Sequence, residues 1–153
     1  MPNWCENRIL VEGEEHHRHE FVDKNKGFDA YDTDKTDYRD LSFDAMIPIP
    51  RNKLKGEGWY DFCCDNWGTK WNAREPEVDH NIKYTEYTFQ TAWCFPNIWL
   101  EKVSRKFKQL IFKVTWAEEG GEGGWFAMSN GKYLEEKRMT QDQWKEVIGY
   151  EDE

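Results

Sequence analysis

The chain has 153 residues, a length that suits one domain with a real hydrophobic core. Aromatic residues make up 16% of it and supply large buried side chains, which a disordered chain would lack. The net charge of −9 argues against nonspecific nucleic-acid binding, because neutralising phosphates needs a dominant basic surface. No apolar run approaches membrane-spanning length, so we expect no membrane partner.

Cysteine and histidine usage indicates the compartment and the metal chemistry. The four cysteines show no C-x-x-C spacing, and no signal-peptide-like apolar region lies near the start, so we expect a reduced, cytoplasmic protein. His16, His17 and His19 crowd one segment and raise the possibility of a transition-metal site. Without a further ligand at helical spacing beyond Glu20, we favour a solvated helix face and predict no metal and no cofactor.

The first elements are a strand and a helix. Residues 7–12 alternate like a strand, with Ile9 and Val11 on one side, and Gly13 ends them. The charged segment 14–25 reads as a weakly amphipathic helix. The pattern predicts a first β-α step.

An irregular segment and a second helix follow. Residues 23–40 are rich in Asp and Lys and predict an exposed loop or insertion, after which apolar residues return at LSFDAMIPIP. Residues 59–67 have helical spacing, and Gly68 is placed to end that helix. We expect a strand through Trp71 to come next.

The segment KYTEYTFQTAW predicts a central strand. It is rich in β-branched and aromatic residues, and Tyr87, Phe89 and Trp93 fall on one face by alternation. Pro96 then fits the first turn of a helix. The apolar residues of that helix recur at helical spacing: Leu100, Val103 and Phe107.

The last third predicts a strand, a hairpin and a short helix. Strict alternation marks a one-sided strand through Leu110, Phe112, Val114 and Trp116. The segment WFAMSNGKYLEEK predicts a hairpin turning at Asn130 and Gly131, and Thr140 with Gln143 forms a capping box for a terminal helix. The order β-α-(insert)-β-β-α-β predicts a single α+β domain over residues 1–153. We expect a ferredoxin-like antiparallel sheet with helices on one face, plus a C-terminal hairpin and short helix.

Five motifs carry a family resemblance: MPNWCEN, MIPIP, WGTKW, FQTAWCFP and WAEEG. Their order resembles that of the ferredoxin-like family of phage and plasmid proteins that includes YubB, and the likeness spans almost the whole chain. The resemblance implies a mobile-element origin and a ferredoxin-like fold. It implies no established activity and no catalytic residues, and it leaves the 23–40 loop and the tail after Gly131 without a role.

Tryptophan-rich motifs at the ends of elements are the candidate site. In WGTKW, a flexible glycine, a hydroxyl and a cation lie between two indole rings, which suits a pocket rim for an anionic or planar ligand. A cap and core strand is the favoured alternative for each of these two tryptophans, and a solvated side chain is the alternative for Lys70. Thr91 and Trp93 precede a helix N-terminus, which favours anions, although sheet core explains them equally well.

The glycine-rich loop after the one-sided strand contributes two carboxylates. Glu118 and Glu119 suit a ligand's amino edges or a hard cation, but an acidic hairpin connection is the better interpretation. Cys5 has no histidine base in the tryptophan motifs, so we interpret it as structural. The candidate ligand-binding set is Trp67, Thr69, Lys70, Trp71, Thr91, Trp93, Glu118, Glu119 and Trp125.

Two hypotheses of function follow. The first is a non-enzymatic phage or plasmid accessory protein that binds a host protein or a small ligand, with counter-defence as one role. The second is an enzyme acting on a nucleotide-like substrate in a Trp-lined pocket, with Glu118 or Glu119 as general base. Aromatic stacking supplies affinity in both.

Overall fold

The structure is a computed structural model that describes residues 3–149. Met1 and Pro2 of the MPNWCEN motif lie outside the described residues. Within those residues, every helix is too short or too polar to cross a membrane.

Six antiparallel strands form one sheet in the order β2-β3-β1-β4-β5-β6. The strands are β1 (Trp4–Glu12), β2 (Arg74–His80), β3 (Thr85–Ala92), β4 (Ile111–Glu118), β5 (Gly123–Ser129) and β6 (Lys132–Arg138). The helices are α1 (Glu15–Asn25), α2 (Gly58–Asn66), α3 (Asn97–Lys106) and α4 (Gln141–Ile148), with short 3-10 turns at Phe43–Ala45 and Arg51–Lys53. Strands β1 to β4 with α1 and α3 make the predicted β-α-β-β-α-β unit of a ferredoxin-like domain, and the β5-β6 hairpin extends its sheet.

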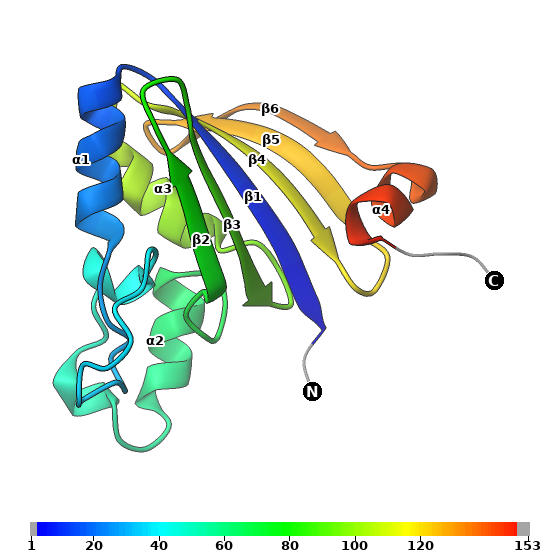
Figure 1. The fold of residues 1–153 in the computed structure, drawn as a ribbon. Coiled ribbons are helices and arrows are strands. Elements are labelled where there is room, and N and C mark those ends of the chain that lie inside the picture. Colours follow the sequence, from blue (N-terminus) through cyan, green and yellow to red (C-terminus); the bar gives the residue numbers. More distant parts are fainter. Residues whose placement is uncertain (1–2, 150–153) are drawn as a thin grey trace.

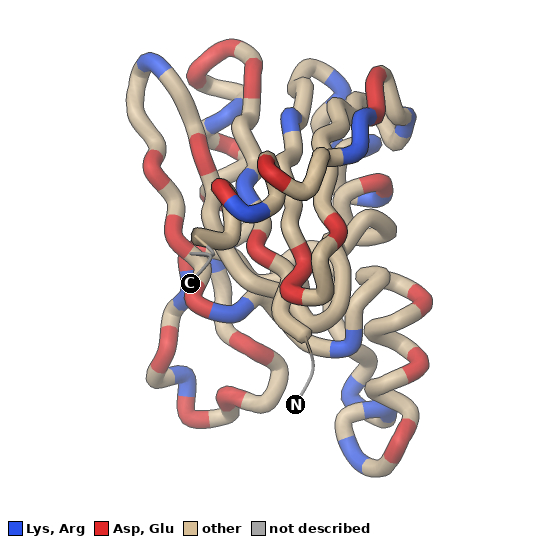
Figure 2. Tube along the Cα trace, turned by 90° about the vertical axis from the view of Figure 1, so that its right-hand side faces the viewer, with Lys and Arg blue, Asp and Glu red and all other residues tan. Residues whose placement is uncertain are grey.

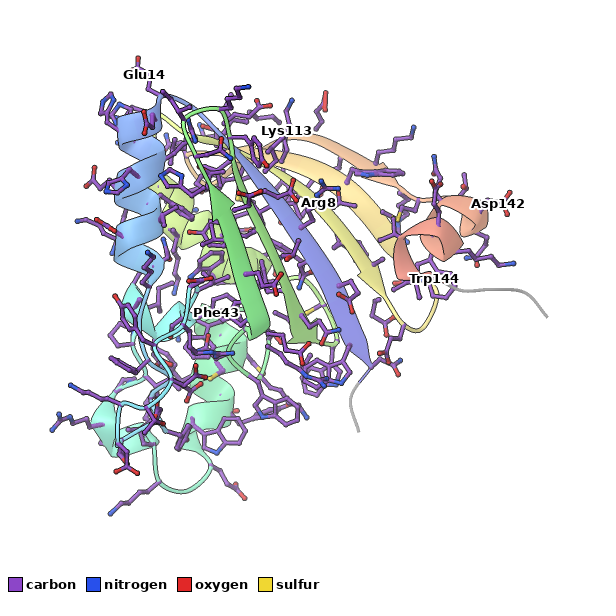
Figure 3. All side chains as sticks on the ribbon, viewed as in Figure 1. Arg8, Glu14, Phe43, Lys113, Asp142 and Trp144 are labelled. Carbon is purple, nitrogen blue, oxygen red and sulfur yellow. The ribbon has the colours of Figure 1, made fainter. Side chains whose placement is uncertain are left out.

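The helices divide the sheet into a covered and an open face. Figure 1 shows α1 and α3 against one face, α2 below the sheet, and α4 on the other side near the end of β4. Arg8 and Lys113 point from the strands away from α1 and α3 (Figure 3). The prediction of helices on one face therefore holds for the ferredoxin-like unit, and the terminal helix borders the open face.

The core lies between the sheet and α1, α2 and α3. Alternation along β1 buries every second residue, from Cys5 to Val11. Phe43 reaches the core from the loop before α2, with ring centroids 5.5 Å from Trp67 and 4.9 Å from Trp99. The segment before α2 is thus anchored by a fully buried ring.

Two local predictions are confirmed, one by backbone dihedral angles and one by side-chain hydrogen bonds. Asn130 and Gly131 have φ values of 52° and 73°, as the predicted two-residue hairpin turn requires. The Thr140 side chain accepts from the Gln143 amide, and the Gln143 side chain accepts from the Thr140 amide, which completes the capping box.

The predicted strand through Trp71 is wrong. Residues 68–71 form a bend, and the strand starts at Arg74. Gly68 has a φ of 86°, and a Cβ there would lie 2.7 Å from the Asn97 side-chain oxygen, so the chain passes close to the start of α3. The Thr69 hydroxyl then donates to the Ala92 carbonyl at 2.7 Å and holds this bend against the end of β3.

The predicted face of the interior strand β3 is correct for Tyr87 and Phe89 but wrong for Trp93. Trp93 follows the strand with a φ of 71°, which takes its ring out of the alternation and leaves it 40% exposed. Pro96, expected in the first turn of α3, is instead the residue that precedes it. The strand end is therefore a turn that presents an indole to the outside.

Residues 26–42 connect α1 to the first 3-10 turn. They contain an isolated bridge between Gly27 and Arg39, and α1 includes the first residues of the predicted 23–40 loop. The rest of the segment is irregular, as predicted. Figure 1 shows it beside α2 at the lower end of the molecule, next to the ends of β2 and β3.

Candidate tryptophan pocket

A cavity of about 560 Å³ opens below the sheet, and we call it the tryptophan pocket. Its walls come from the start of β1, the irregular segment after α1, helix α2 and the bend before β2. The volume lies within the range of natural small-molecule sites, roughly 300–1,000 Å³. Elements far apart in the sequence therefore converge on one hollow.

Indole rings supply much of the wall. Trp4, Trp59 and Trp71 all line the pocket, and the ring centroids of Trp4 and Trp71 lie 5.9 Å apart at an interplanar angle of 37°. Trp71 is 39% exposed, so part of its side chain is accessible to a ligand. Trp4 reaches this place because antiparallel pairing sets it opposite Ala92, at the end of β3.

Cations lie on these rings. The Lys70 ammonium lies 4.0 Å from the ring centroid of Trp71 and 4.6 Å from that of Trp93. The Arg74 guanidinium carbon lies 4.3 Å from the Trp4 centroid. All three distances fit cation–π attraction, and within residues 3–149 neither cation forms a salt bridge.

Asn72 ties the pocket together. Its side-chain oxygen accepts from the amides of Phe43 and Ala73, each at 2.8 Å. Its amide nitrogen lies 3.2 Å from carboxylate oxygens of both Asp29 and Asp44. One side chain thus joins the irregular segment to the bend before β2.

Burial perturbs two titratable groups around the pocket. It raises the pKa of the Asp44 carboxyl to about 6, partly offset by hydrogen bonds from the amides of Ile49 and Ala30. Burial also raises the pKa of the Cys63 thiol to about 12, with nearby Asp44 adding to the effect. Cys63 therefore lines the pocket as a neutral thiol, and not as a nucleophile.

Only part of the predicted site set lines this pocket: Trp67, Lys70 and Trp71. Trp67 is a core residue that is 1% exposed, and its indole N–H donates to the Ile47 carbonyl at 3.0 Å. Trp93 contributes by flanking Lys70. The alternative of inward packing is thus correct for Trp67, whereas Trp71 is at the surface.

Thr69 and Thr91 do not face the pocket. Both are buried, and the Thr91 hydroxyl donates to the Cys94 carbonyl at 2.6 Å while it accepts from Asn7 at 2.8 Å. The Thr69 hydroxyl is occupied in holding the bend before β2 to the end of β3, and the Thr91 hydroxyl in joining the end of β3 to β1 and to the turn after β3. They position the ring-bearing residues beside them and are not exposed to a ligand.

Glu118, Glu119 and Trp125 lie elsewhere. Glu118 ends β4 opposite Cys5, and the Glu119 amide donates to the Trp4 carbonyl at 3.1 Å, so the acidic turn borders the start of β1 without lining the pocket. Trp125 lies in β5 on the open face, with the Lys137 ammonium 5.7 Å from its ring centroid. Strand register separates these residues from the WGTKW motif.

Sequence reasoning missed Trp4, Asp29, Trp59 and Arg74 as site residues. Trp4 and Trp59 were visible as isolated indoles, but their contacts depend on strand pairing and on the path of the irregular segment. Asp29 belongs to the segment left without a role. The density of aromatic and basic residues at the ends of elements was the one available signal.

A second cavity, of about 570 Å³, lies on the open face. It includes Trp125 and three cations, Arg8, Lys113 and Lys137. Arg8 pairs with Glu86 at 2.8 Å and Lys113 with Glu12 at 3.0 Å. Figure 2 shows acidic and basic positions interspersed over this side of the molecule.

A histidine cluster lies at the start of α1. Glu14, His16 and His17 offer ligand atoms within 4.8 Å of one another, and Glu14 is a partner that sequence reasoning did not consider. Glu14 and His16 are exposed, and His17 is half-buried. Figure 3 places Glu14 at the opposite end of α1 from the irregular segment, so this cluster is separate from the tryptophan pocket.

Comparison with protein families identifies the fold. The family model described as the ferredoxin-like domain in Api92-like protein matches residues 66–151. The chain belongs to this family. The match includes Lys70, Trp71 and Arg74, whereas Trp4, Asp29 and Trp59 precede it, so the tryptophan pocket combines the Api92-like domain with the part of the chain before it.

A solved structure has a similar fold. The crystal structure of Api92 from Yersinia pseudotuberculosis matches with a TM-score of 0.69 and 8% identity, covering 92% of this chain and 99% of that chain. At that identity the match shows a shared fold only. No curated protein matches the chain.

Proposed function

We propose that this Api92-like protein is a non-enzymatic binding protein that holds a small, planar, anionic ligand in the tryptophan pocket. One observation carries the proposal: the Lys70 ammonium lies on the exposed ring of Trp71 and forms no salt bridge within the described residues. A ring offers a stacking surface, and a cation without a carboxylate partner is available to an anion.

The balance of charges at the pocket supports an anionic ligand. The chain has 21 basic and 30 acidic residues. The pocket lining reverses this ratio, with Arg39, Lys70 and Arg74 against Asp29. A local excess of cations in an acidic protein favours negative ligands at this place.

The enzyme alternative has weaker support. Its proposed base, Glu118 or Glu119, does not line the pocket. A general base must come within hydrogen-bond reach of the proton it removes. Catalysis on a nucleotide-like substrate thus stays a prediction without a placed base.

The biological setting is also a proposal. The motif order of MPNWCEN, MIPIP, WGTKW, FQTAWCFP and WAEEG supports a YubB-like accessory protein of a phage or plasmid, acting in the host cytoplasm. Sequestering a small host ligand would suit counter-defence. Capture of a host protein is the competing form of the binding hypothesis.

The test uses 8-anilinonaphthalene-1-sulfonate, a planar aromatic anion whose fluorescence rises on binding. We expect saturable binding to the native protein, weakened roughly tenfold or more by Trp71→Ala, as expected for loss of one stacking ring. Lys70→Met should also weaken it. The matched controls are Trp125→Ala and Lys137→Met, which remove the same kind of ring and cation from the open face and should change affinity less than about twofold.

Equal losses in the pocket and open-face variants would contradict the proposal, as would an absence of saturable binding. Thermal melts of all four variants check that the fold is kept. Native mass spectrometry of protein purified from host cells adds a second reading. A retained small molecule supports the proposal, and a stoichiometric host subunit in its place supports the competing form.

A further inference from the structure

We infer that the ligand of the tryptophan pocket is a nucleoside monophosphate whose base carries an exocyclic amino group. This inference rests on the proposed function and specifies its ligand. It assigns the base to the indole rings, the phosphate to Lys70 and Arg74, and the amino group to Asp29.

The rings suit a nucleobase. Trp4, Trp59 and Trp71 come from three separate segments and line one cavity of about 560 Å³. A flat heterocycle stacks on indole rings through its whole face, and this contact tolerates every base. The pocket volume lies in the range of sites that enclose most of the surface of a drug-sized ligand, and a mononucleotide is about that size.

The cations suit a phosphate. Lys70 and Arg74 are held over Trp71 and Trp4 at 4.0 and 4.3 Å, so each cation covers one face of its ring and a base would stack on the opposite face. Arginine and lysine are the usual phosphate ligands, because they donate charge-assisted hydrogen bonds. A group that stacks on these rings therefore places an attached phosphate within the field of two cations.

Asp29 supplies an acceptor at the same cavity. One of its carboxylate oxygens accepts from the Tyr31 amide at 2.9 Å and the other from the Asn72 side chain at 3.2 Å. Each carboxylate oxygen accepts about two hydrogen bonds, so each keeps capacity for one more donor. The exocyclic amino groups of guanine, adenine and cytosine are such donors.

The same features disfavour simple anions and neutral rings. Inorganic phosphate would use the cations but leave the indole faces in water. A nucleoside would use the rings and Asp29 but leave Lys70 without an anion. A nucleotide engages all three parts of the pocket, and affinity should fall when any of them is removed.

The experiment titrates GMP, AMP and CMP against the native protein by isothermal calorimetry at physiological salt, with IMP and UMP as matched ligands that lack the amino group. We expect at least one amino-bearing nucleotide to bind more than fivefold tighter than its match. Its nucleoside and inorganic phosphate should each bind at least tenfold more weakly than the nucleotide. If no amino-bearing nucleotide exceeds its match, or if the nucleoside binds as tightly as the nucleotide, the inference is overturned.

Variants test each contact for the best-binding nucleotide. Trp71→Ala should weaken both nucleotide and nucleoside by roughly 5- to 150-fold. Lys70→Met should weaken the nucleotide by roughly tenfold and leave the nucleoside within twofold. Asp29→Asn should reduce the preference over the amino-free match to less than twofold. Lys137→Met on the open face is the control and should change none of these values.

Two outcomes separate the inference from the proposed function. If anilinonaphthalene sulfonate binds through Trp71 and Lys70 but no nucleotide binds, the inference fails and the binding function stands. If neither binds, both fail. A ten-residue oligo(dT) that binds more than tenfold tighter than any mononucleotide overturns the inference in favour of a single-strand track.

Discussion

The two large cavities are nearly equal in size, about 570 Å³ on the open face and 560 Å³ in the tryptophan pocket. They differ in the partners of the cations that line them. On the open face, Arg8 and Lys113 each pair with a glutamate on a neighbouring strand. In the tryptophan pocket, Lys70 and Arg74 lie on indole rings. The kinds of residue are similar, and their partners decide what a ligand would meet.

Sheet register explains the difference. Leu10 pairs with both Glu86 and Lys113, so Arg8 and Glu86 are diagonal neighbours across β1 and β3. Lys113 and Glu12 are diagonal neighbours across β4 and β1 in the same way. Regular strands thus bring opposite charges together. The pocket lies at the strand ends instead: Lys70 precedes β2, and Arg74, the first residue of β2, is paired with Gln90 and not with a carboxylate.

The largest expected effect is on the free energy of unfolding, and it compares a residue that holds the tryptophan pocket together with one on the open face. Asn72→Ala removes hydrogen bonds that join Phe43 and Ala73 to the acidic side chains beneath the pocket. It should lower the free energy of unfolding by about 2–4 kcal/mol, because buried partners lose their hydrogen bonds. Glu135→Ala on the exposed β6 is the control and should cost less than about 0.5 kcal/mol. Urea denaturation measures both, and equal losses would contradict the contrast.

The next prediction concerns Asp44, whose burial raises its pKa to about 6 from an ordinary value of 3.8. A carboxyl with a raised folded-state pKa takes up a proton on folding. Its stabilising contribution is therefore complete below about pH 4 and is lost as pH rises through about 6. Carbon-13 NMR should show the Asp44 carboxyl titrating near pH 6.

Asp44→Asn should flatten the fall in unfolding free energy between pH 4 and pH 7. Urea denaturation across this range measures the slope. A midpoint for Asp44 near pH 4, or an unchanged slope in Asp44→Asn, would contradict the raised pKa of this carboxyl.

Trp93 provides a smaller test of the pocket rim. Its φ of 71° is unfavourable for a bulky residue, whereas glycine adopts it freely. Trp93→Gly should therefore be about 1 kcal/mol more stable than Trp93→Ala, which keeps the strain and loses the same ring. Thermal or urea unfolding of this pair measures the difference. Equal stability of the two variants would mean that the backbone relaxes when the indole is removed.

The smallest expected effect would make the open face resemble the tryptophan pocket. Glu12→Gln with Glu86→Gln removes the partners of Lys113 and Arg8 and keeps the size of the side chains. Since exposed pairs are worth up to about 1 kcal/mol, affinity of the open face for anilinonaphthalene sulfonate should rise by a few-fold at most. The Trp71→Ala background isolates that second site. An unchanged affinity for anilinonaphthalene sulfonate in that background would show that the salt bridges are not what keeps Arg8 and Lys113 from binding an anion.

The elements that sequence predicted best depend on near neighbours. The hairpin at Asn130 and Gly131 and the cap at Thr140 require contacts within about three residues, so local pattern was sufficient. The strand through Trp71 failed because Gly68 packs against the start of α3, and that close approach carries no local signature. The predicted face of Trp93 was wrong because this residue has a left-handed backbone conformation, which breaks the alternation that β3 follows.

The sequence by itself determined the ferredoxin-like order of elements, since apolar residues repeat every two residues in a strand and every three to four residues in a helix. It also determined the acidic balance and the concentration of indoles at the ends of elements. Only the tertiary structure decided which of those indoles share a pocket. Trp4, Asp29 and Trp71 are far apart in the chain, and β-strand pairing together with the Asn72 hydrogen bonds brings them together. Such long-range contacts set a site, and no local period encodes them.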